Sequence, residues 1–240
     1  SHNGLGVVNF DGNTDTLYSA NEWGGKREFT ILSIARYTHS TNNGRLISDR
    51  TSNNWIFGFH SGRMHTWHFG GWLTQVDNGK DTNFHLHSAS MTNNDRGNTF
   101  FDGSRVGSVN GNGASGSYMP RQIQFGGWQT SSEFSKGEVA EFIAFDRVLG
   151  DSERLAVEGY LANKWGIAHQ LPADHFNRDT MAGIGSGISA EITAASPTQA
   201  YPIPVSVTFK KNGTNHSVSN FANDFTTSFK PSEINGLELW

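Results

Sequence analysis

Residues Gly137–Leu149 read GEVAEFIAFDRVL and are the most informative stretch of the chain. Within them, the residues of Glu138–Asp146 alternate between two sides, because successive side chains of a β-strand point in opposite directions. The alternation therefore predicts one shared face for Val139, Glu141, Ile143 and Phe145. A strand with one buried face and one solvent-exposed face is typical of an antiparallel sheet.

The residues that follow change to a helical spacing over Asp151–Gly166. Asp151 or Ser152 can cap the start of this helix, and Glu153 lies in the first turn, where the helix dipole favours an acid. Gly166 supplies a C-terminal stop. The sequence thus predicts one short helix directly after the strand.

Upstream of this pair, turn signals such as Asp11-Gly12 and Asn78-Gly79 recur at short and fairly even intervals. Runs rich in Val, Ile, Thr and aromatic residues lie between them, which is typical of an antiparallel sandwich or barrel. The predicted strands are Val7–Phe10, Thr16–Ala20, Phe29–Tyr37, Arg45–Arg50, Trp55–His60, Arg63–Phe69, Asn83–Met91, Thr99–Val109, Gln122–Gly126 and Glu138–Asp146.

The composition excludes several classes of protein. The chain has 240 residues, 28 Gly and no Cys, so neither a disulfide scaffold nor a thiolate zinc site is possible. The formal net charge of −4 provides no basic field for nucleic acid. No apolar run approaches the roughly 20 residues that a membrane-spanning helix needs, so we expect no membrane insertion.

Several motifs together resemble the LamG-like jelly-roll domains of the concanavalin A-like lectin/glucanase superfamily. The C-terminal signature lies in Gly137–Leu149 and Tyr160–Gly166, and the hairpins of Phe10–Leu17 and Phe101–Gly103 match the same family. The resemblance covers roughly residues 5–177. It implies an all-β, antiparallel two-sheet jelly-roll sandwich with one short C-terminal helix, typically extracellular, that binds glycans or proteins and often holds calcium.

The composition shifts after about Asn177, where the Gly-rich stretch Gly183–Gly187 leads into a β-rich tail. We therefore expect a jelly-roll domain over residues 1–177 and a tail over residues 178–240, with strands at Ile188–Ala194, Ile203–Lys210 and Thr226–Phe229. Domains of the family commonly open with a Leu-x-Leu-Trp strand, whereas here Gly236–Trp240 closes the sequence with that pattern. This segment either begins a next repeat or folds back to complete the present jelly roll.

A group of polar and aromatic residues is the first candidate site. Arg63, His65 and Trp67 share one face of a predicted strand, and His85 and His87 share one face of another. If the two strands are neighbours in one sheet, an indole and three imidazoles form a surface that can bind a sugar. A transition-metal site and an ordinary solvated sheet face are the alternatives.

Calcium is the second candidate ligand. Asp11, Asn13 and Asp15 form a string that superficially resembles a calcium loop, but the continuation lacks the Gly and Glu of an EF-hand. Turn chemistry, in which these side chains bond their own backbone, is the simpler interpretation. Asp146, at the end of its strand, could join a jelly-roll calcium site with Asp11 and Asp15.

The sequence lacks the motifs of related enzymes. Glucanases of the superfamily carry a Glu-x-Asp-x-x-Glu strand, which is absent here, and Glu138 and Glu141 fall on opposite faces. Gln122–Gln124 lacks the His of the alginate-lyase motif. Glu141 occupies a family motif position and is expected to be hydrogen-bonded within the fold.

Three functions remain open at this point. The first is a non-catalytic, extracellular or cell-surface module that binds a glycan or an extracellular protein, within a bacterial multidomain surface or secreted protein. The second is a polysaccharide hydrolase or lyase of the same fold. The third is a structural spacer in a tandem adhesin-like array.

Overall fold

The computed structural model describes residues 1–19, 27–39, 44–51, 53–75, 81–94, 96–110, 120–129, 132–175, 178, 190–192, 207–211 and 214–218. The chain forms two compact units, Ser1–Asp179 and Thr180–Trp240. Among the described residues, no helix is long and apolar enough to cross a membrane. The predicted boundary at Asn177, the stretch Gly183–Gly187, the predicted strand Thr226–Phe229 and the segment Gly236–Trp240 lie outside the described residues.

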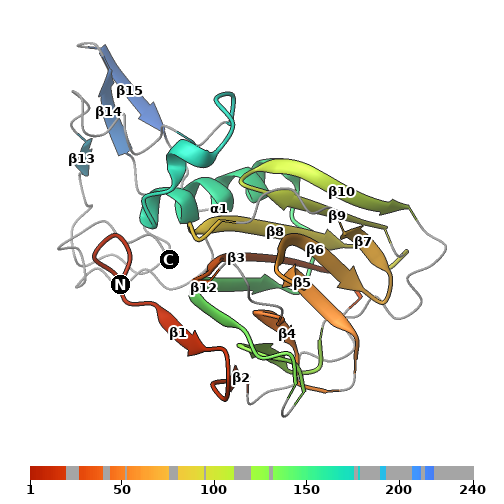
Figure 1. Ribbon diagram of the computed structural model, residues 1–240. Coiled ribbons are helices and arrows are strands. Elements are labelled where there is room, and N and C mark those ends of the chain that lie inside the picture. Colours follow the sequence, from red (N-terminus) through yellow and green to blue (C-terminus); the bar gives the residue numbers. More distant parts are fainter. Residues whose placement is uncertain are drawn as a thin grey trace, which may run out of the picture. The chain divides into compact units, whose positions relative to one another are not determined.

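The first unit is an antiparallel β-sandwich of two six-stranded sheets, which confirms the predicted all-β fold class (Figure 1). The first sheet has the order β1 (Val8–Asp11), β12 (Lys136–Phe145), β3 (Phe29–Tyr37), β8 (His85–Met91), β9 (Arg96–Phe101) and β10 (Ser104–Asn110). The second has the order β2 (Leu17–Tyr18), β11 (Ile123–Phe125), β4 (Ile47–Asp49), β5 (Trp55–His60), β6 (Arg63–Phe69) and β7 (Trp72–Gln75).

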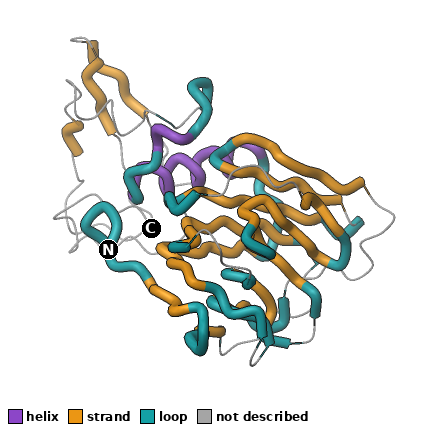
Figure 2. Tube along the Cα trace, in the orientation of Figure 1, coloured by secondary structure: helices purple, strands orange, loops and turns teal. Residues whose placement is uncertain are grey.

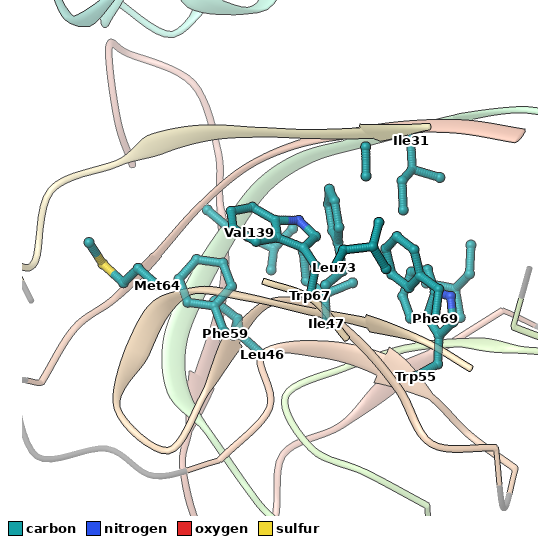
Figure 3. Close-up of a cluster of buried hydrophobic side chains, with 14 of the residues drawn as sticks. Ile31, Leu46, Ile47, Trp55, Phe59, Met64, Trp67, Phe69, Leu73 and Val139 are labelled. Carbon is teal, nitrogen blue, oxygen red and sulfur yellow. The ribbon is translucent and has the colours of Figure 1, made fainter. Parts of the chain in front are cut away.

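Aromatic side chains fill the space between the two sheets. Phe29, Phe57 and Phe69 are fully buried, and the rings of Trp55 and Phe69 stack with their centroids 4.7 Å apart. Figure 3 shows Trp55 and Phe69 in this layer together with aliphatic side chains such as Leu73. Because each large aromatic side chain buries an apolar surface of about 150–250 Å², this layer holds the sandwich together without disulfides.

The helix α1 (Asp151–Lys164) and the 3-10 helix η1 (Ala168–Gln170) lie on one side of the strands (Figure 2). Leu161 and Trp165 pack against Leu32 of β3 and Leu86 of β8, on the side of the first sheet away from the sandwich interior. The first sheet is therefore covered on both faces. The outer face of the second sheet has no helix in the described part of the unit.

The start of the helix differs from the prediction. The N-cap residue is Gly150, and neither Asp151 nor Ser152 provides a side-chain cap. Instead, the backbone N–H of Gly150 donates to Glu153 Oε2 over 2.9 Å. An acid in the first turn thus binds the exposed backbone directly, in addition to complementing the helix dipole.

One predicted strand is two strands in the structure. The interval Thr99–Val109 contains β9 and β10, which pair with each other across the turn at Asp102 and Gly103. Both turn residues have positive φ, 46° and 76°. The Asp-Gly turn signal therefore outweighs the continuous β-forming composition around it. The short strand β7 was not predicted.

The second unit contains an antiparallel sheet in the order β13 (Ala190–Ile192), β14 (Val207–Lys211) and β15 (Thr214–Val218). The strands β13 and β14 fall largely within the predicted strands Ile188–Ala194 and Ile203–Lys210. The strand β15 was not predicted.

Candidate functional site

The predicted cluster of imidazoles and an indole forms, but not on a surface. The condition that its two strands are neighbours in one sheet is not met, because β6 belongs to the second sheet and β8 to the first. The rings of Trp67 and His87 meet across the sandwich interior with centroids 5.7 Å apart. Trp67 has no exposed surface and lies between the sheets (Figure 3), so it presents no platform to a sugar.

Three of the predicted imidazoles surround the ring of Phe101. The centroids of His65, His85 and His87 lie 4.0, 4.6 and 5.2 Å from it. His65 and His85 are buried, as is His87, whereas Arg63 is half-buried at the start of β6. These contacts are those of a packed aromatic core.

The two imidazoles on β8 have opposite electrostatic surroundings. Burial holds the pKa of His87 well below its usual value, and its Nε2 donates to the carbonyl oxygen of Met64 over 3.2 Å. Burial also opposes protonation of His85, but hydrogen bonds to Asp102 and Asp81, at 2.6 and 3.0 Å, produce a net rise of its pKa. His87 is therefore neutral, whereas His85 favours the charged form.

The predicted calcium ligands lie in a turn. Asp11 Oδ1 accepts backbone N–H groups from Asn13, Thr14 and Asp15 at 2.8, 3.0 and 3.1 Å. These hydrogen bonds, that of Thr14 first, lower the pKa of Asp11 to about 2. The described residues hold no group of three or more His, Asp or Glu side chains placed for a metal ion. Calcium at Asp11, Asp15 and Asp146 remains a prediction of the sequence.

Glu138 and Glu141, and also Glu133, which lies close to them in the sequence, each have a separate partner. Glu133 Oε2 accepts from Arg45 Nε at 2.7 Å, and Glu138 Oε2 accepts from Arg36 Nε at 2.8 Å. Glu141 Oε2 accepts from the indole of Trp165, as the expected hydrogen bond within the fold. These three carboxylates therefore do not form the facing acid and nucleophile of a glycosidase.

A continuous row of side chains crosses the outer face of the second sheet. Residues directly opposite each other in antiparallel strands share a face, and Gln124 lies outside because Ile123 and Phe125 pack into the interior. The paired positions follow one another from strand to strand. We call this set the outer row: Tyr18, Gln124, Ser48, Ile56, His68 and Trp72.

The two ends of the outer row are open, whereas its middle is covered. Tyr18 and Trp72 are 46% and 44% exposed, but Gln124, Ser48 and Ile56 are buried. Ser48 Oγ donates to the carbonyl oxygen of Gly127, which places the turn after β11 against the middle of the row. The sheet therefore offers two separate aromatic positions.

Trp128 extends this covering turn toward the Trp72 end. Its ring lies beneath the guanidinium of Arg45, 4.0 Å from the ring centroid, and its Nε1 donates to the carbonyl oxygen of Asn53 over 3.2 Å. The following residue, Asn54, accepts a hydrogen bond from His68 Nδ1 over 2.6 Å. Two hydrogen bonds, made to the adjacent residues Asn53 and Asn54, thus connect Trp128 to His68.

The protonation state of His68 and the geometry of its contact with Trp72 are both defined. Because the Asn54 carbonyl can only accept, His68 Nδ1 carries a proton. Burial lowers the pKa of His68, so the ring is neutral and its Nε2 is an acceptor. The two rings meet edge to face, with centroids 4.7 Å apart and an interplanar angle of 79°.

Sequence reasoning missed these surface aromatics although a signal exists. Phe69–Trp72 and Phe125–Trp128 both read Phe-Gly-Gly-Trp. In each copy the Phe packs into the sandwich core, and the first Gly has a positive φ, 74° at Gly70 and 84° at Gly126. The Gly-Gly turn then brings the Trp to the outer face.

No protein-family model matches the chain, and none of the curated proteins does. Among solved structures, it is similar to the binding domain of botulinum neurotoxin serotype D, with a TM-score of 0.52 and 10% identity over 90% of this chain and 65% of that one. A second structure, the receptor binding domain of botulinum neurotoxin D, gives the same TM-score and identity, with 67% of that chain covered.

A looser match, with a TM-score of 0.46 and 12% identity, joins 64% of this chain to 77% of Domain 4 of AbnA, a GH43 extracellular arabinanase from Geobacillus stearothermophilus solved with arabinotriose. The present chain spans 65% of the length of the first neurotoxin domain. At 10% identity, the neurotoxin comparisons show that this chain shares their β-sandwich fold.

Proposed function

We propose that the protein is a non-catalytic, extracellular or cell-surface binding module that recognises carbohydrate through the Trp72 end of the outer row. The observation that carries this proposal is the exposed indole of Trp72 beside the neutral imidazole of His68. The proposal includes membership in the LamG-like group and a place in a bacterial surface or secreted protein, as the sequence motifs imply.

The pair offers the two kinds of contact that a sugar requires. An indole face provides flat apolar area for the C–H face of a pyranose or furanose ring. His68 Nε2 provides a directional acceptor for a hydroxyl group, and its ring cannot rotate freely because Nδ1 is held by Asn54. Apolar area with few oriented polar groups is characteristic of small-molecule sites.

The exposure of the two sheets also favours the outer face of the second sheet as the binding surface. Helix α1 covers the first sheet, whereas Trp72 and Tyr18 remain exposed on the second. At the Tyr18 end, the guanidinium of Arg50 lies over the ring of Tyr18, 4.2 Å from its centroid. One face of this ring is therefore already covered by a charged group. We therefore assign the primary contact to Trp72.

The comparisons agree with a binding role at the level of fold. Two similar sandwiches are described as the binding domain and the receptor binding domain of a botulinum neurotoxin. An extracellular protein partner is the alternative ligand for the same surface.

A glycan array followed by isothermal titration tests the proposal. The first arm compares the wild type with Trp72→Ala. We expect the variant to lose most of the affinity, because a sugar ring can stack only where the aromatic ring is present. The matched control is Tyr160→Ala, which removes an aromatic residue of helix α1 that is 37% exposed. No binding to any glycan, or an equal loss in both variants, contradicts the proposal.

A second variant examines the role of His68. His68→Phe keeps an aromatic ring beside Trp72 but removes the Nε2 acceptor. Since a net hydrogen bond contributes about 0.5–1.5 kcal/mol, we expect the affinity to fall by roughly 2- to 12-fold. Unchanged affinity would place the sugar away from this end of the outer row.

A further inference from the structure

A pocket lies where the end of β3, the start of β8 and the turn between α1 and η1 meet. Its volume is about 420 Å³, and its lining includes Arg36 of β3, His85 of β8 and Gln170 of η1. Small-molecule sites in proteins have volumes of about 300–1,000 Å³, so this pocket has room for a small ligand. It shares no residue with the outer row.

The N-terminal turn forms one wall of the pocket and is held in place from two sides. The backbones of His2 and Leu5 exchange two hydrogen bonds of 3.0 and 2.9 Å. Asn3 Nδ2 donates to the carbonyl oxygen of Lys164 over 2.8 Å, which fixes the turn to the end of α1. The ring of His2 lies against that of Phe84, with centroids 4.5 Å apart, so its position beside the pocket is defined.

The charged side chains of the pocket are already paired. Arg36 Nε donates to Glu138 Oε2 over 2.8 Å. The two ring nitrogens of His85 lie 2.6 and 3.0 Å from carboxylate oxygens of Asp102 and Asp81. An anion in the pocket would meet carboxylates, and a cation would meet the guanidinium. Because an unpaired charge is costly to remove from water, this lining favours a neutral ligand.

Two polar atoms of the pocket wall have no partner among the described residues. These atoms are His2 Nε2 and Gln170 Oε1, and both are shielded from solvent. Buried polar atoms nearly always have a hydrogen-bond partner, and leaving one unpaired costs free energy. Side-chain rotations are common when a ligand binds, and a rotation of either side chain would bring its polar atom into the pocket.

Hydroxyl groups fit these two atoms. A hydroxyl donates one hydrogen bond and accepts two, so it can pair with the Gln170 amide oxygen and with His2 Nε2 in either tautomer. Phe84 and Ile167 add apolar atoms to the same lining. A neutral ring that carries hydroxyl groups on a C–H framework offers both kinds of contact.

We infer that this pocket is a second ligand site, which binds one neutral saccharide unit through Gln170 and His2. The inference goes beyond the proposed function, because it requires neither Trp72 nor any other residue of the outer row. A free monosaccharide and the terminal unit of a longer glycan present the same hydroxyl groups, and the experiment has an arm for each.

A titration followed by NMR is the first test, with the full chain carrying Trp72→Ala so that the outer row no longer contributes. The probes are glucose, galactose and N-acetylglucosamine. We expect at least one probe to shift the side-chain amide signals of Gln170 and the imidazole signals of His2. An oligosaccharide that ends in the same sugar and binds more tightly identifies a glycan end, whereas weaker binding identifies the free sugar.

Matched variants separate a binding role from a structural one. Gln170→Met should lower the affinity by roughly 2- to 12-fold, the effect of one hydrogen bond. Its Tm should stay equal or rise, because a buried oxygen without a partner is replaced by apolar atoms. Gln122→Met is the control, since Gln122 is half-buried and does not line the pocket. His169→Trp, at an exposed position of the lining, should fill the pocket and abolish binding.

Three results would overturn the inference. The first is that no probe shifts the signals of His2 and Gln170 at millimolar concentration, which would mean that water alone enters the pocket. The second is unchanged affinity in both Gln170→Met and His169→Trp. The third is a Tm of Gln170→Met well below that of Gln122→Met, which would make Gln170 a structural residue.

The same variants distinguish this inference from the proposed function. Sugar binding that is lost in Trp72→Ala but kept in Gln170→Met would support the outer row and overturn the second site. Binding that is kept in Trp72→Ala but weakened in Gln170→Met would support the second site and contradict the role of Trp72.

Discussion

The indole of Trp165 donates a hydrogen bond to Glu141 Oε2 over 2.6 Å, and this bond joins the end of helix α1 to strand β12. Trp165 is 3% exposed, so its N–H group has no water to replace a lost acceptor. The Lys164 ammonium donates to the other carboxylate oxygen over 3.2 Å. One carboxylate thereby anchors the helix layer to the first sheet.

Glu141→Ala should lower the free energy of unfolding by about 1–3 kcal/mol, because it leaves a buried indole N–H without a partner. Glu141→Gln should cost less, since the amide oxygen can still accept from Trp165 while only the charge opposite Lys164 is lost. Urea denaturation at constant pH measures both. Equal losses in the two variants would mean that the charge, and not the indole hydrogen bond, is the important part.

Gly58→Ala should destabilise the sandwich more than Gly4→Ala. Both glycines have a positive φ, 81° and 78°, so both substitutions incur a backbone cost of roughly 1–2 kcal/mol. A Cβ at Gly58 would also lie 2.7 Å from His87 Cδ2, whereas nothing lies within 4 Å at Gly4. The difference between the two Tm values isolates the steric contact with His87.

The buried His87 should make the protein sensitive to acid. Its pKa in the folded state is lowered, chiefly by burial, so the unfolded state binds one more proton below its ordinary pKa of about 6.5. Stability then falls by about 1.4 kcal/mol for each pH unit below that value. His87→Leu should flatten this dependence between pH 6.5 and 5, as measured by urea denaturation; an unchanged slope would contradict the assignment.

The imidazole of His85 should have the opposite effect on the pH dependence of stability. Its folded pKa is raised despite burial, because Asp102 and Asp81 bind the charged form, so this contribution is complete below about pH 6.5 and is lost as the pH rises through the folded pKa. Asp102→Asn removes one of the two carboxylates and should reduce the loss of stability above pH 6.5. The same pH series measures it, and a steeper loss in the variant would refute the prediction.

Calcium binding by Asp11, Asp15 and Asp146 is tested by thermal unfolding with and without chelator. An ion that binds only the folded state stabilises it by about 2.7 kcal/mol at a concentration 100 times its Kd. A Tm that rises with calcium and no longer does so in Asp15→Asn would support the site. A Tm unaffected by either calcium or chelator would remove it.

Local sequence patterns predicted much of the first unit correctly. The strands β3, β5 and β6 have the predicted ends, and helix α1 begins at the predicted Asp151. Alternation and helical spacing depend on neighbours within a few residues, so they can be read from the chain directly. The prediction that Val139 shares a face with Ile143 and Phe145 is wrong, because a β-bulge between Val139 and Glu141 shifts the alternation of β12. The two strands β9 and β10 were merged because β-forming residues continue on both sides of a two-residue turn.

The candidate site could not be predicted in the same way. His65 and Trp67 share a face, as their spacing requires, but the spacing does not say whether that face is the core or the surface. The outer row depends on the pairing of six strands, some of them more than 50 residues apart in the chain. Such long-range pairings depend on tertiary packing, which no local pattern contains.

The sequence by itself determined most strands of the first unit, its α-helix and several of its turns, because these follow from side-chain periodicity and from glycine's access to positive φ. Only the tertiary structure decided that β6 and β8 lie in opposite sheets, which buries Trp67 against His87 and leaves Trp72 exposed. The physical reason is that the burial of apolar surface depends on contacts between residues far apart in the chain. These contacts decide which face of each strand is removed from water.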